Sequence, residues 1–313
     1  MKITAVGEIL IDMTQTHIDE NGNPHFAAIP GGAPANVAVA VSKLGGEAAF
    51  VGCVGDDQYG RLLRDTLVRY GVSTGGLQVT KCANTTLAIV TVDPQGERSF
   101  SFYRKPGADT MIQADRAVRD AADTDILYFG SVSLTDPCCR EAVVTAVRAA
   151  KNAGALITYD PNYRAPLWNS EEEAALQMRA VLPLCDIVKI SDEETMLLCG
   201  THDPEEALQA LMPLGIRLAV VTLGKNGALW RCGGMKGRVP GFSVKVADTN
   251  GAGDTFFGSL LYRIAARGGL EGLTEEEING MVRFANKAAS ITTSRPGAIP
   301  AMPVLQEVEE GLK

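Results

Sequence analysis

The chain has 313 residues, of which 46% are hydrophobic and 21% charged, as is ordinary for a soluble globular enzyme with one large α/β domain or two smaller ones. A formal net charge of −8 argues against a general nucleic-acid or anionic-membrane surface. An anionic substrate would therefore need local donors, such as glycine loops and single Arg or Lys residues.

The N-terminal part predicts alternating strands and helices. Residues 2–13 resemble a first strand that ends in Asp12, and residues 33–44 a helix that tolerates Pro34 in its first turn. A strand over 48–54 and a helix over 59–70 follow.

From residue 126 onward, short apolar runs alternate with amphipathic stretches. We expect strands at 126–129, 156–159, 187–190 and 218–222, and helices at 136–153, 170–182, 192–199 and 204–212. This alternation predicts an α/β fold of three layers, with a doubly wound, mainly parallel central sheet and helices on both faces.

Two segments, 14–30 and 85–104, lack helical periodicity. The second alternates on both sides of a turn at residues 93–96, which predicts a β-hairpin, and its Phe100 and Phe102 face one side and need a surface to cover. We therefore expect one domain over residues 1–313, with these segments inserted as a small β-sheet lid.

The cysteines and histidines point away from disulfides and zinc. The seven cysteines are odd in number, scattered and without a Cys-x-x-Cys pair, which favours buried, reduced thiols in the cytoplasm. His17, His25 and His202 have no paired metal spacing. No basic-then-apolar leader and no apolar stretch of membrane-spanning length is expected.

The most informative run lies at residues 248–254, just before an apolar helix-like stretch. Gly251 and Gly253 let backbone N–H groups point at an anion at a helix N-terminus, and Asp254 places a base beside it. An anion cradle with an adjacent base suits phosphoryl transfer to a hydroxyl. The same residues could instead form a tight turn with an Asp cap.

Four further clusters each allow a ligand or a plain structural role. Gly31, Gly32 and Asn36 could contact hydroxyls or form a turn before a helix. Thr222 and Gly224 could hold phosphate oxygens, whereas Asn226 and Gly227 form a natural hairpin turn.

The other two clusters follow strands, where ligands bind in open α/β sheets. Asp160 and Asn162 could orient metal-bound water and Arg164 could meet a phosphate or carboxylate, against a simple loop turn. Glu194 could hold Mg²⁺ through water, or cap a helix with Ser191. A P-loop is missing, as is the dinucleotide fingerprint after the first strand, which weakens a dehydrogenase interpretation.

In this order, the motifs resemble the ribokinase-like sugar kinases of phosphofructokinase-B type. One signature of this family matches Gly31, Gly32 and Asn36, and the other matches residues 248–254. Residues 54–60, 160–162 and 222–224 lie between the two signatures in the family's order. The resemblance covers essentially the whole chain. It implies a β-sheet lid over a sugar, ATP as phosphoryl donor, and Mg²⁺.

The resemblance also implies residue roles. Asp254 would be the base, and the amides of Gly251, Ala252 and Gly253 the anion hole. Sugar contacts are expected at Asp12, Gly31, Gly32, Asn36, Phe102, Arg104, Arg164 and Asp254, and ATP contacts at Asn162, Ser191, Thr222, Gly224, Gly227, Gly251, Gly253 and Asn286. Glu194 would serve Mg²⁺ through water, and Asp248 with the backbone of Gly297 a monovalent cation such as K⁺. Ser191 departs from the family, which has Asn there.

Residues 103–109 and 160–168 look most like bacterial fructokinases, which favours D-fructose as substrate and fructose 6-phosphate as product. They are also similar to 2-keto-3-deoxygluconate kinases, in which arginines at the places of Arg104 and Arg164 meet a carboxylate. A riboside or nucleoside kinase, or a sugar sensor on the same fold, stays open. The resemblance further suggests a homodimer through the lid sheet. The net charge predicts no nucleic-acid or membrane partner.

Overall fold

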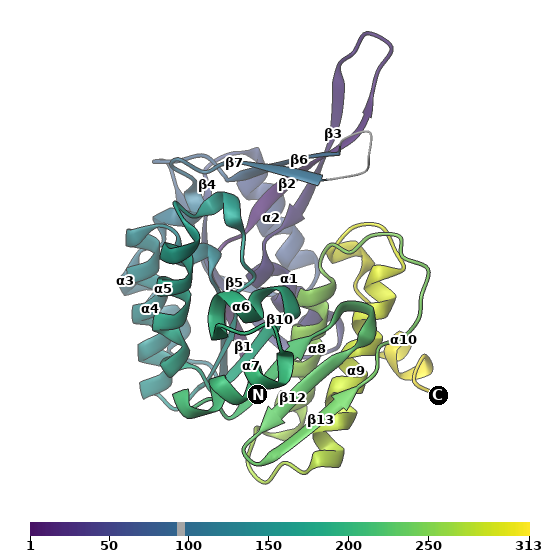
Figure 1. The fold of residues 1–313 in the computed structure, drawn as a ribbon. Helices are drawn as coiled ribbons and strands as arrows, with labels where there is room; N and C mark the ends of the chain where they lie inside the picture. Colours follow the sequence, from purple (N-terminus) through teal and green to yellow (C-terminus); the bar gives the residue numbers. More distant parts are fainter. Residues whose placement is uncertain (93–97) are drawn as a thin grey trace.

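The computed structural model describes residues 1–92 and 98–313, and its framework is a nine-stranded sheet (Figure 1). Seven neighbouring strands of this sheet, β11, β10, β9, β8, β1, β4 and β5, pair in parallel. The two strands at one edge, β12 and β13, pair antiparallel. This confirms the predicted mainly parallel central sheet. The strand order is β13 (Met235–Val239), β12 (Ala228–Cys232), β11 (Leu218–Thr222), β10 (Ile187–Ser191), β9 (Leu156–Asp160), β8 (Ile126–Gly130), β1 (Lys2–Val6), β4 (Glu47–Gly55) and β5 (Ser73–Thr80).

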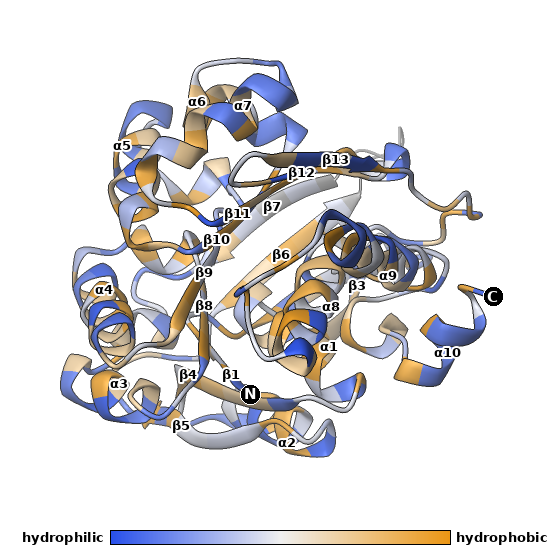
Figure 2. Ribbon diagram, turned by 90° about the horizontal axis from the view of Figure 1, so that it is seen from below, coloured by the Kyte–Doolittle hydropathy of each residue, from blue (hydrophilic) through white to orange (hydrophobic). Residues whose placement is uncertain are grey.

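Helices cover both faces of this sheet, which confirms the three layers (Figure 2). One face packs on α1 (Ala33–Lys43), α2 (Gln58–Arg69), α8 (Ala252–Arg267) and α9 (Glu275–Thr293), with α10 (Leu305–Glu310) against α9. The other face packs on α3 (Ala114–Ala121), α4 (Pro137–Asn152), α5 (Glu171–Val181), α6 (Thr195–Cys199) and α7 (Pro204–Leu211). In the part of the chain that the structure describes, no helix is both long and apolar enough to cross a membrane.

The single first strand predicted over residues 2–13 is wrong. β1 ends at Val6, and Gly7 adopts a φ of 146°, which side chains rarely tolerate. A Cβ on Gly7 would also lie 2.8 Å from the hydroxyl oxygen of Ser133 and 2.9 Å from Cγ of Pro34. The chain therefore leaves the main sheet at Gly7, and Asp12 belongs to a different sheet.

That second sheet has four strands in the order β3 (Pro24–Gly31), β2 (Leu10–Ile18), β6 (Leu87–Val92) and β7 (Arg98–Tyr103). The β2–β3 hairpin projects from the body of the molecule (Figure 1). β6 and β7 pair antiparallel with Leu87 opposite Tyr103, which confirms the two strands of the second predicted hairpin. The turn predicted at 93–96 and the side chain of Phe100 lie outside the described residues.

Some elements escaped prediction, and the expected burial of the cysteines holds only in part. β5 carries Gly75 and Gly76 and so lacks apolar alternation, and α3 is a helix of eight residues. All seven cysteines are free thiols, and burial raises the pKa of Cys53, Cys139 and Cys185. Cys82 and Cys138, however, are exposed.

Candidate active site

The glycines of the 248–254 run shape the start of helix α8. Gly251 precedes the helix with a φ of 73°, and a Cβ on it would lie 2.9 Å from Cβ of Ala298, so glycine is required twice over. Among the residues that the structure describes, no side chain caps this helix start. The N–H of Ala252 donates to the carbonyl of Thr249 at 3.3 Å, whereas the N–H of Gly253 is placed to receive an anion, as at other helix starts without a side-chain cap.

Asp254 stands in the first turn of α8 and is 8% exposed. The side-chain amide of Asn36, on α1, donates a hydrogen bond of 2.8 Å to its carboxylate. Burial raises the pKa of Asp254 above its usual 3.8, while the Asn36 bond and the charges of Lys189 and Arg164 oppose the rise. Oδ1 of Asn36 is buried and accepts no hydrogen bond from the described residues. A hydroxyl placed there could donate to Asn36 and face Asp254.

The glycines at 31 and 32 let the second sheet pass close to this pair. The carboxylate of Asp12, on β2, occupies the space that a side chain on Gly31 would need. Gly32 has a φ of 106°, and a Cβ on it would lie 2.8 Å from the carbonyl oxygen of Glu8. Burial raises the pKa of Asp12 to about 6, with Arg164 lowering it and Asp254 raising it further. Asp12 therefore belongs to the same electrostatic cluster as Asp254.

The two candidate arginines sit in different surroundings. Arg104, just after β7, is buried and its Nε donates to Asp109 at 2.7 Å, while its other nitrogens donate to Thr135 at 2.6 Å and to the carbonyl of Val132 at 3.1 Å. Most of its donors are thus used within the protein. Arg164 is exposed and donates to the carbonyl of Tyr163 at 3.0 Å.

A buried ion pair lies behind the anion cradle. Nζ of Lys189, on β10, is 2.8 Å from Oδ2 of Asp160 at the end of β9, and both side chains are nearly inaccessible. A Cβ on Gly253 would lie 3.3 Å from the same Nζ. Burial would lower the pKa of Lys189, but Asp160, Glu194 and Asp254 raise it, so the ammonium stays charged. Oδ1 of Asp160 is buried and finds no partner among the described residues.

Glu194 connects two loops at the carboxyl ends of the strands. Its carboxylate accepts the N–H of Ser191 at 2.8 Å, which bears out the expected helix cap, and the N–H of Tyr163 at 2.8 Å. Neighbouring Asn162 has a φ of 47°, an uncommon conformation for a residue other than glycine. Such backbone is often held in place at functional sites.

A cavity of about 490 Å³ opens beside the start of α8. The side-chain amide of Asn286 braces one wall by donating to the carbonyls of Val239 and Pro240, each at 3.2 Å. Of the predicted ATP residues, the cavity is lined by Thr222, Gly224, Gly227, Gly253 and Asn286; Asn162, Ser191 and Gly251 lie outside its lining.

Asp248 links two late loops beside this cavity. Its carboxylate accepts the N–H of Asn250 at 3.0 Å and the N–H of Gly297 at 3.1 Å. Its own N–H donates to the carbonyl of Thr293 at 3.2 Å. The structure thus brings Asp248 and Gly297 together across 49 positions of sequence.

This arrangement joins a buried carboxylate, a helix start without a side-chain cap and a cavity of about 490 Å³, and comparison with known proteins shows its family. Residues 1–305 match the model of the pfkB family of carbohydrate kinases. The chain belongs to this family. A relative is "Probable fructokinase-4" of Arabidopsis thaliana, 43% identical over 99% of this chain and 96% of that protein.

Two solved structures extend the likeness of this pfkB-family chain. Fructokinase from Xylella fastidiosa with bound ATP has a TM-score of 0.91 and 37% identity, covering 100% of this chain and 99% of the other. A double mutant of fructokinase from Vibrio cholerae O395, with fructose, ADP and potassium ion bound, has a TM-score of 0.89 and 34% identity, covering 100% and 98%. The ribokinase-like fold and the ATP-dependent carbohydrate kinase are both confirmed.

Sequence reasoning missed Lys189 in this carbohydrate kinase. The signal was present, since Lys189 is a charged residue within the otherwise apolar run 187–190. A lysine almost never lies fully buried unless it is paired. Only the fold shows that its partner is Asp160 and that its ammonium faces Gly253.

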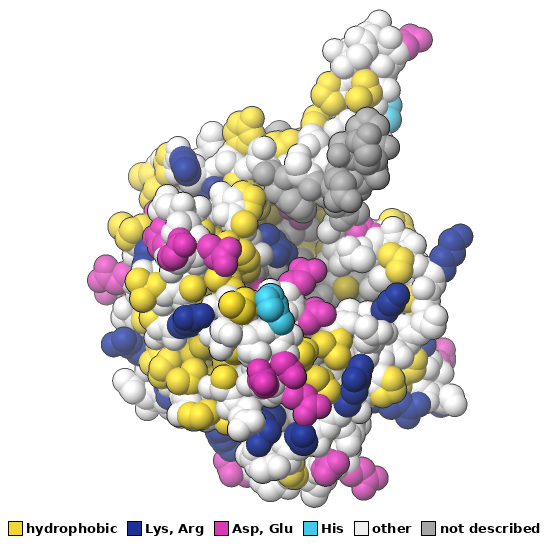
Figure 3. Space-filling view, viewed as in Figure 1, with side chains coloured by type: hydrophobic (Ala, Val, Ile, Leu, Met, Phe, Trp, Pro, Cys, Tyr) yellow, Lys and Arg dark blue, Asp and Glu magenta, His cyan; other side chains and the backbone are white. Residues whose placement is uncertain are grey.

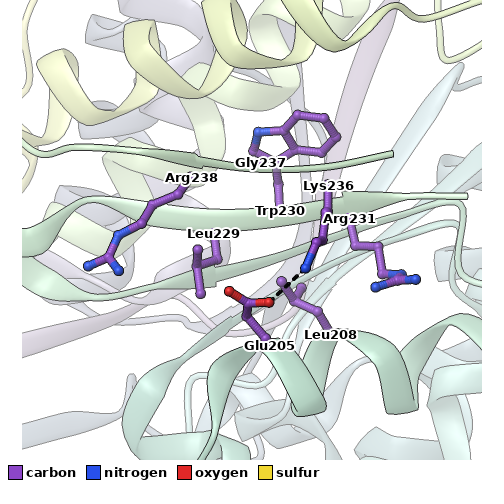
Figure 4. Close-up of a pocket in the computed structure, with 8 residues that line it drawn as sticks. All are labelled: Glu205, Leu208, Leu229, Trp230, Arg231, Lys236, Gly237 and Arg238. Atoms are coloured by element: carbon purple, nitrogen blue, oxygen red, sulfur yellow. Dashed lines mark hydrogen bonds and ion pairs between the residues drawn. The ribbon is translucent and has the colours of Figure 1, made fainter. Parts of the chain in front are cut away.

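A smaller cavity of about 180 Å³ lies between α7 and the β12–β13 hairpin (Figure 4). An ion pair of 2.9 Å between Lys236 and Glu205 spans it. None of the predicted site residues lines it. In this kinase it is therefore distinct from the site at the start of α8.

Proposed function

We propose that this chain is a fructokinase that transfers the γ-phosphoryl group of ATP to the 6-hydroxyl of D-fructose. The observation that carries the proposal is the Asn36–Asp254 pair beside the uncapped start of α8. The vacant acceptor on Asn36 suits a sugar hydroxyl, and the α8 N–H groups suit a phosphate. The fructokinase names of the relatives supply the sugar.

In the proposed reaction, oxygen O6 of fructose attacks the γ-phosphorus. The new P–O bond forms as the bond to the β,γ-bridging oxygen breaks, the hydroxyl proton passes to Asp254, and ADP leaves with the bridging oxygen. The amides of Gly251, Ala252 and Gly253 receive the charge on the equatorial phosphoryl oxygens. Asp12, Gly31, Gly32, Asn36 and Phe102 hold the sugar, and Thr222, Gly224, Gly227 and Asn286 hold the nucleotide. Gly251 and Gly253 also contact the phosphates of the nucleotide. Asn162 and Ser191 provide the remaining ATP contacts.

Lys189 supplies a fixed positive charge to this anion hole. Its ammonium stands beside Gly253, and Asp160 holds it there through a 2.8 Å bond. A preorganised charge costs no rearrangement when the phosphoryl group becomes more negative. Both side chains are buried, so water screens this charge little.

The residues around Asp160 and Glu194 fit a hydrated Mg²⁺. Oδ1 of Asp160 is a buried acceptor with no partner among the described residues, and a metal-bound water would satisfy it. Glu194 has free lone pairs beyond its two backbone bonds. Mg²⁺ bound with ATP neutralises phosphate charge.

We propose that Asp248, whose carboxylate accepts the N–H of Gly297, holds a monovalent cation with the backbone of that loop, because carboxylate and carbonyl oxygens are hard ligands. We expect turnover to be several-fold higher in potassium chloride than in tetramethylammonium chloride at equal ionic strength. ADP formation in the two salts is the measurement. Equal rates would contradict the cation site.

The sugar specificity follows from how Arg104 is held. Its bonds to Asp109, Thr135 and Val132 leave few donors for a substrate carboxylate, which favours a neutral ketose over 2-keto-3-deoxygluconate. Arg164, exposed at the rim, is left to meet hydroxyls or phosphate.

We expect kcat/KM for fructose to exceed that for 2-keto-3-deoxygluconate, ribose and nucleosides by about 100-fold or more, as suits a site built around substrate hydroxyls. Coupled-enzyme ADP release on this panel is the measurement. A higher kcat/KM for the sugar acid or a riboside would make that compound the assigned substrate in place of fructose. No turnover on any member of the panel would favour a sugar sensor.

The second sheet is proposed as a lid that excludes water and as a dimer surface. Its β2–β3 hairpin stands clear of the body (Figure 3), and Ile18 and Tyr103 on its strands are 60% and 68% exposed. Pairing two such sheets would cover these side chains and the open strand edges. A monomer in sedimentation at all concentrations would contradict the dimer.

The free thiols suit a reducing compartment, so a cytoplasmic location is proposed.

A further inference from the structure

The buried carboxyl group of Glu8 lies beside residues 31–36, here called the sugar-binding turn, and takes no part in the reaction described above. Glu8 is 2% exposed and stands where the chain leaves β1 for the second sheet. Buried glutamates are uncommon unless they are paired or hydrogen-bonded. Its position at this crossing therefore calls for a function.

Glu8 supplies the cap that helix α1 lacks. Gly32, which precedes α1, has no side chain, and Pro34 in the first turn has no N–H group. Oε1 of Glu8 accepts the N–H of Ala33 at 3.2 Å, from 25 positions earlier in the chain. One of the open donors at this helix start is thus satisfied by a distant residue.

The other carboxyl oxygen connects to the loop that follows β8. The hydroxyl of Ser133 lies 3.3 Å from Oε2 of Glu8, in the loop that follows β8. The backbone of Glu8 also touches the turn, because a Cβ on Gly32 would lie 2.8 Å from its carbonyl oxygen. Glu8 thus joins the sugar-binding turn to the β8 loop.

The turn so held carries the side chain that meets the base. The N–H of Asn36 donates to the carbonyl of Gly32 at 2.9 Å, and the Asn36 side chain donates to Asp254 at 2.8 Å. A shift of Ala33 would therefore move Asn36. Misplacement of a positioning group by about 1 Å can cost around 100-fold in rate.

We propose that Glu8 is a positioning residue for the sugar-phosphorylation reaction: its carboxyl group clamps the 31–36 turn through Ala33 and Ser133 and so holds Asn36 against the substrate and Asp254. The proposal rests on the proposed function. It concerns the sugar side of the site alone, since Glu8 does not line the nucleotide cavity.

The geometry works with the carboxyl group in either protonation state. A hydroxyl both donates and accepts, so Ser133 can donate to a carboxylate or accept from a carboxylic acid. Burial raises the pKa of Glu8 to about 7, and Asp109 and Asp254 raise it while Arg104 lowers it. The buried Tyr128 and Cys139 also feel its charge. A glutamine at this position can accept from Ala33 and donate to Ser133, and so reproduces the protonated form.

The test compares Glu8→Gln with Glu8→Leu in steady-state kinetics on fructose and ATP. We expect the glutamine variant to stay within about threefold of wild type, the size of a modest hydrogen-bond change. The leucine variant should lose about 10- to 100-fold in kcat/KM for fructose with the KM for ATP unchanged. Ser133→Ala is a smaller change and should also lower kcat/KM for fructose. It tests the proposal even if Glu8→Leu fails to fold.

Asp203→Leu is the matched control, because Asp203 caps α7 through the N–H groups of Glu205 and Glu206. It should lower thermal stability and leave fructose kinetics unchanged. Three results would overturn the proposal. One is unchanged fructose kinetics in both Glu8→Leu and Ser133→Ala; another is a rise in the KM for ATP as large as the change for fructose. The third is a glutamine variant as impaired as the leucine variant. A wild-type enzyme inactive on fructose would instead overturn the proposed function, so the two failures are distinct.

The pH dependence of stability gives a second readout. The folded state keeps the proton of Glu8 up to about pH 7, whereas an ordinary glutamate releases it near 4.5. The folded state then binds more protons than the unfolded state, so this group's contribution to stability falls as pH rises from about 4.5 to 7. Glu8→Gln should remove that fall, and the melting temperature of the variant should gain on wild type across this range. Parallel melting curves would contradict the buried, proton-holding carboxyl group.

Discussion

Replacing Asp254 with asparagine is expected to lower kcat on fructose by about a thousand- to ten-thousandfold. The amide has the same shape and can still accept from Asn36, so the KM values for fructose and ATP should change little. It cannot take the hydroxyl proton at neutral pH. Loss of kcat with binding intact is the signature of a group that acts in the transition state.

The measurement is ADP release under saturating substrates, with fructose and nucleotide binding followed by calorimetry. Asp65→Asn is the matched control, because this side chain on α2 is 63% exposed and remote from the cavity beside α8. It should behave as wild type. Near-normal turnover in the Asp254 variant, or loss of fructose binding as severe as the loss of turnover, would remove Asp254 from its assigned role.

The second large effect is expected at Lys189. Lys189→Met should lower kcat by about 100- to 1,000-fold, the range seen when one preorganised donor of an oxyanion hole is removed. The change also leaves Asp160 as an unpaired buried carboxylate, which by itself destabilises a fold. The single variant therefore mixes two effects, and a second variant must separate them.

The double variant of Lys189→Met with Asp160→Asn removes both buried charges together. Its thermal stability should recover toward wild type, whereas its kcat should stay as low as that of the single variant. Because Lys189 lowers the pKa of Asp254, the acid limb of the kcat/KM profile should also move to higher pH in the single variant. If the double variant regained activity, Lys189 would be only the counter-ion of Asp160.

Much of the fold was predictable because its signals are local. Apolar runs such as 187–190 and 218–222, each followed by a polar turn, predict the strands and the edge where ligands bind. The exit from the main sheet at Gly7 was not predictable, because apolar residues continue on both sides of it. Its positive φ, and the position of Ser133 where a Cβ on Gly7 would need space, exist only in the folded chain.

The local geometry of the candidate site was predictable where one motif carries it: Gly251 precedes a helix and Asp254 lies in its first turn, as residues 248–254 predict. The partners that adjust those residues come from elsewhere in the chain and carry no local signal. Arg104 was expected to face a sugar, and only the fold shows that Asp109, Thr135 and Val132 take up three of its five N–H donors. Lys189 pairs with the side chain of Asp160, 29 positions away in sequence, and Glu8 accepts the backbone N–H of Ala33, 25 positions away.

The most direct test of this account is the identity of the product. Purified enzyme with D-fructose, ATP and Mg²⁺ should yield fructose 6-phosphate and ADP in equal amounts, followed by phosphorus and carbon NMR. Phosphate on another hydroxyl would contradict the proposed placement of O6 between Asn36 and Asp254. ADP with free phosphate and no sugar phosphate would contradict the fructokinase itself.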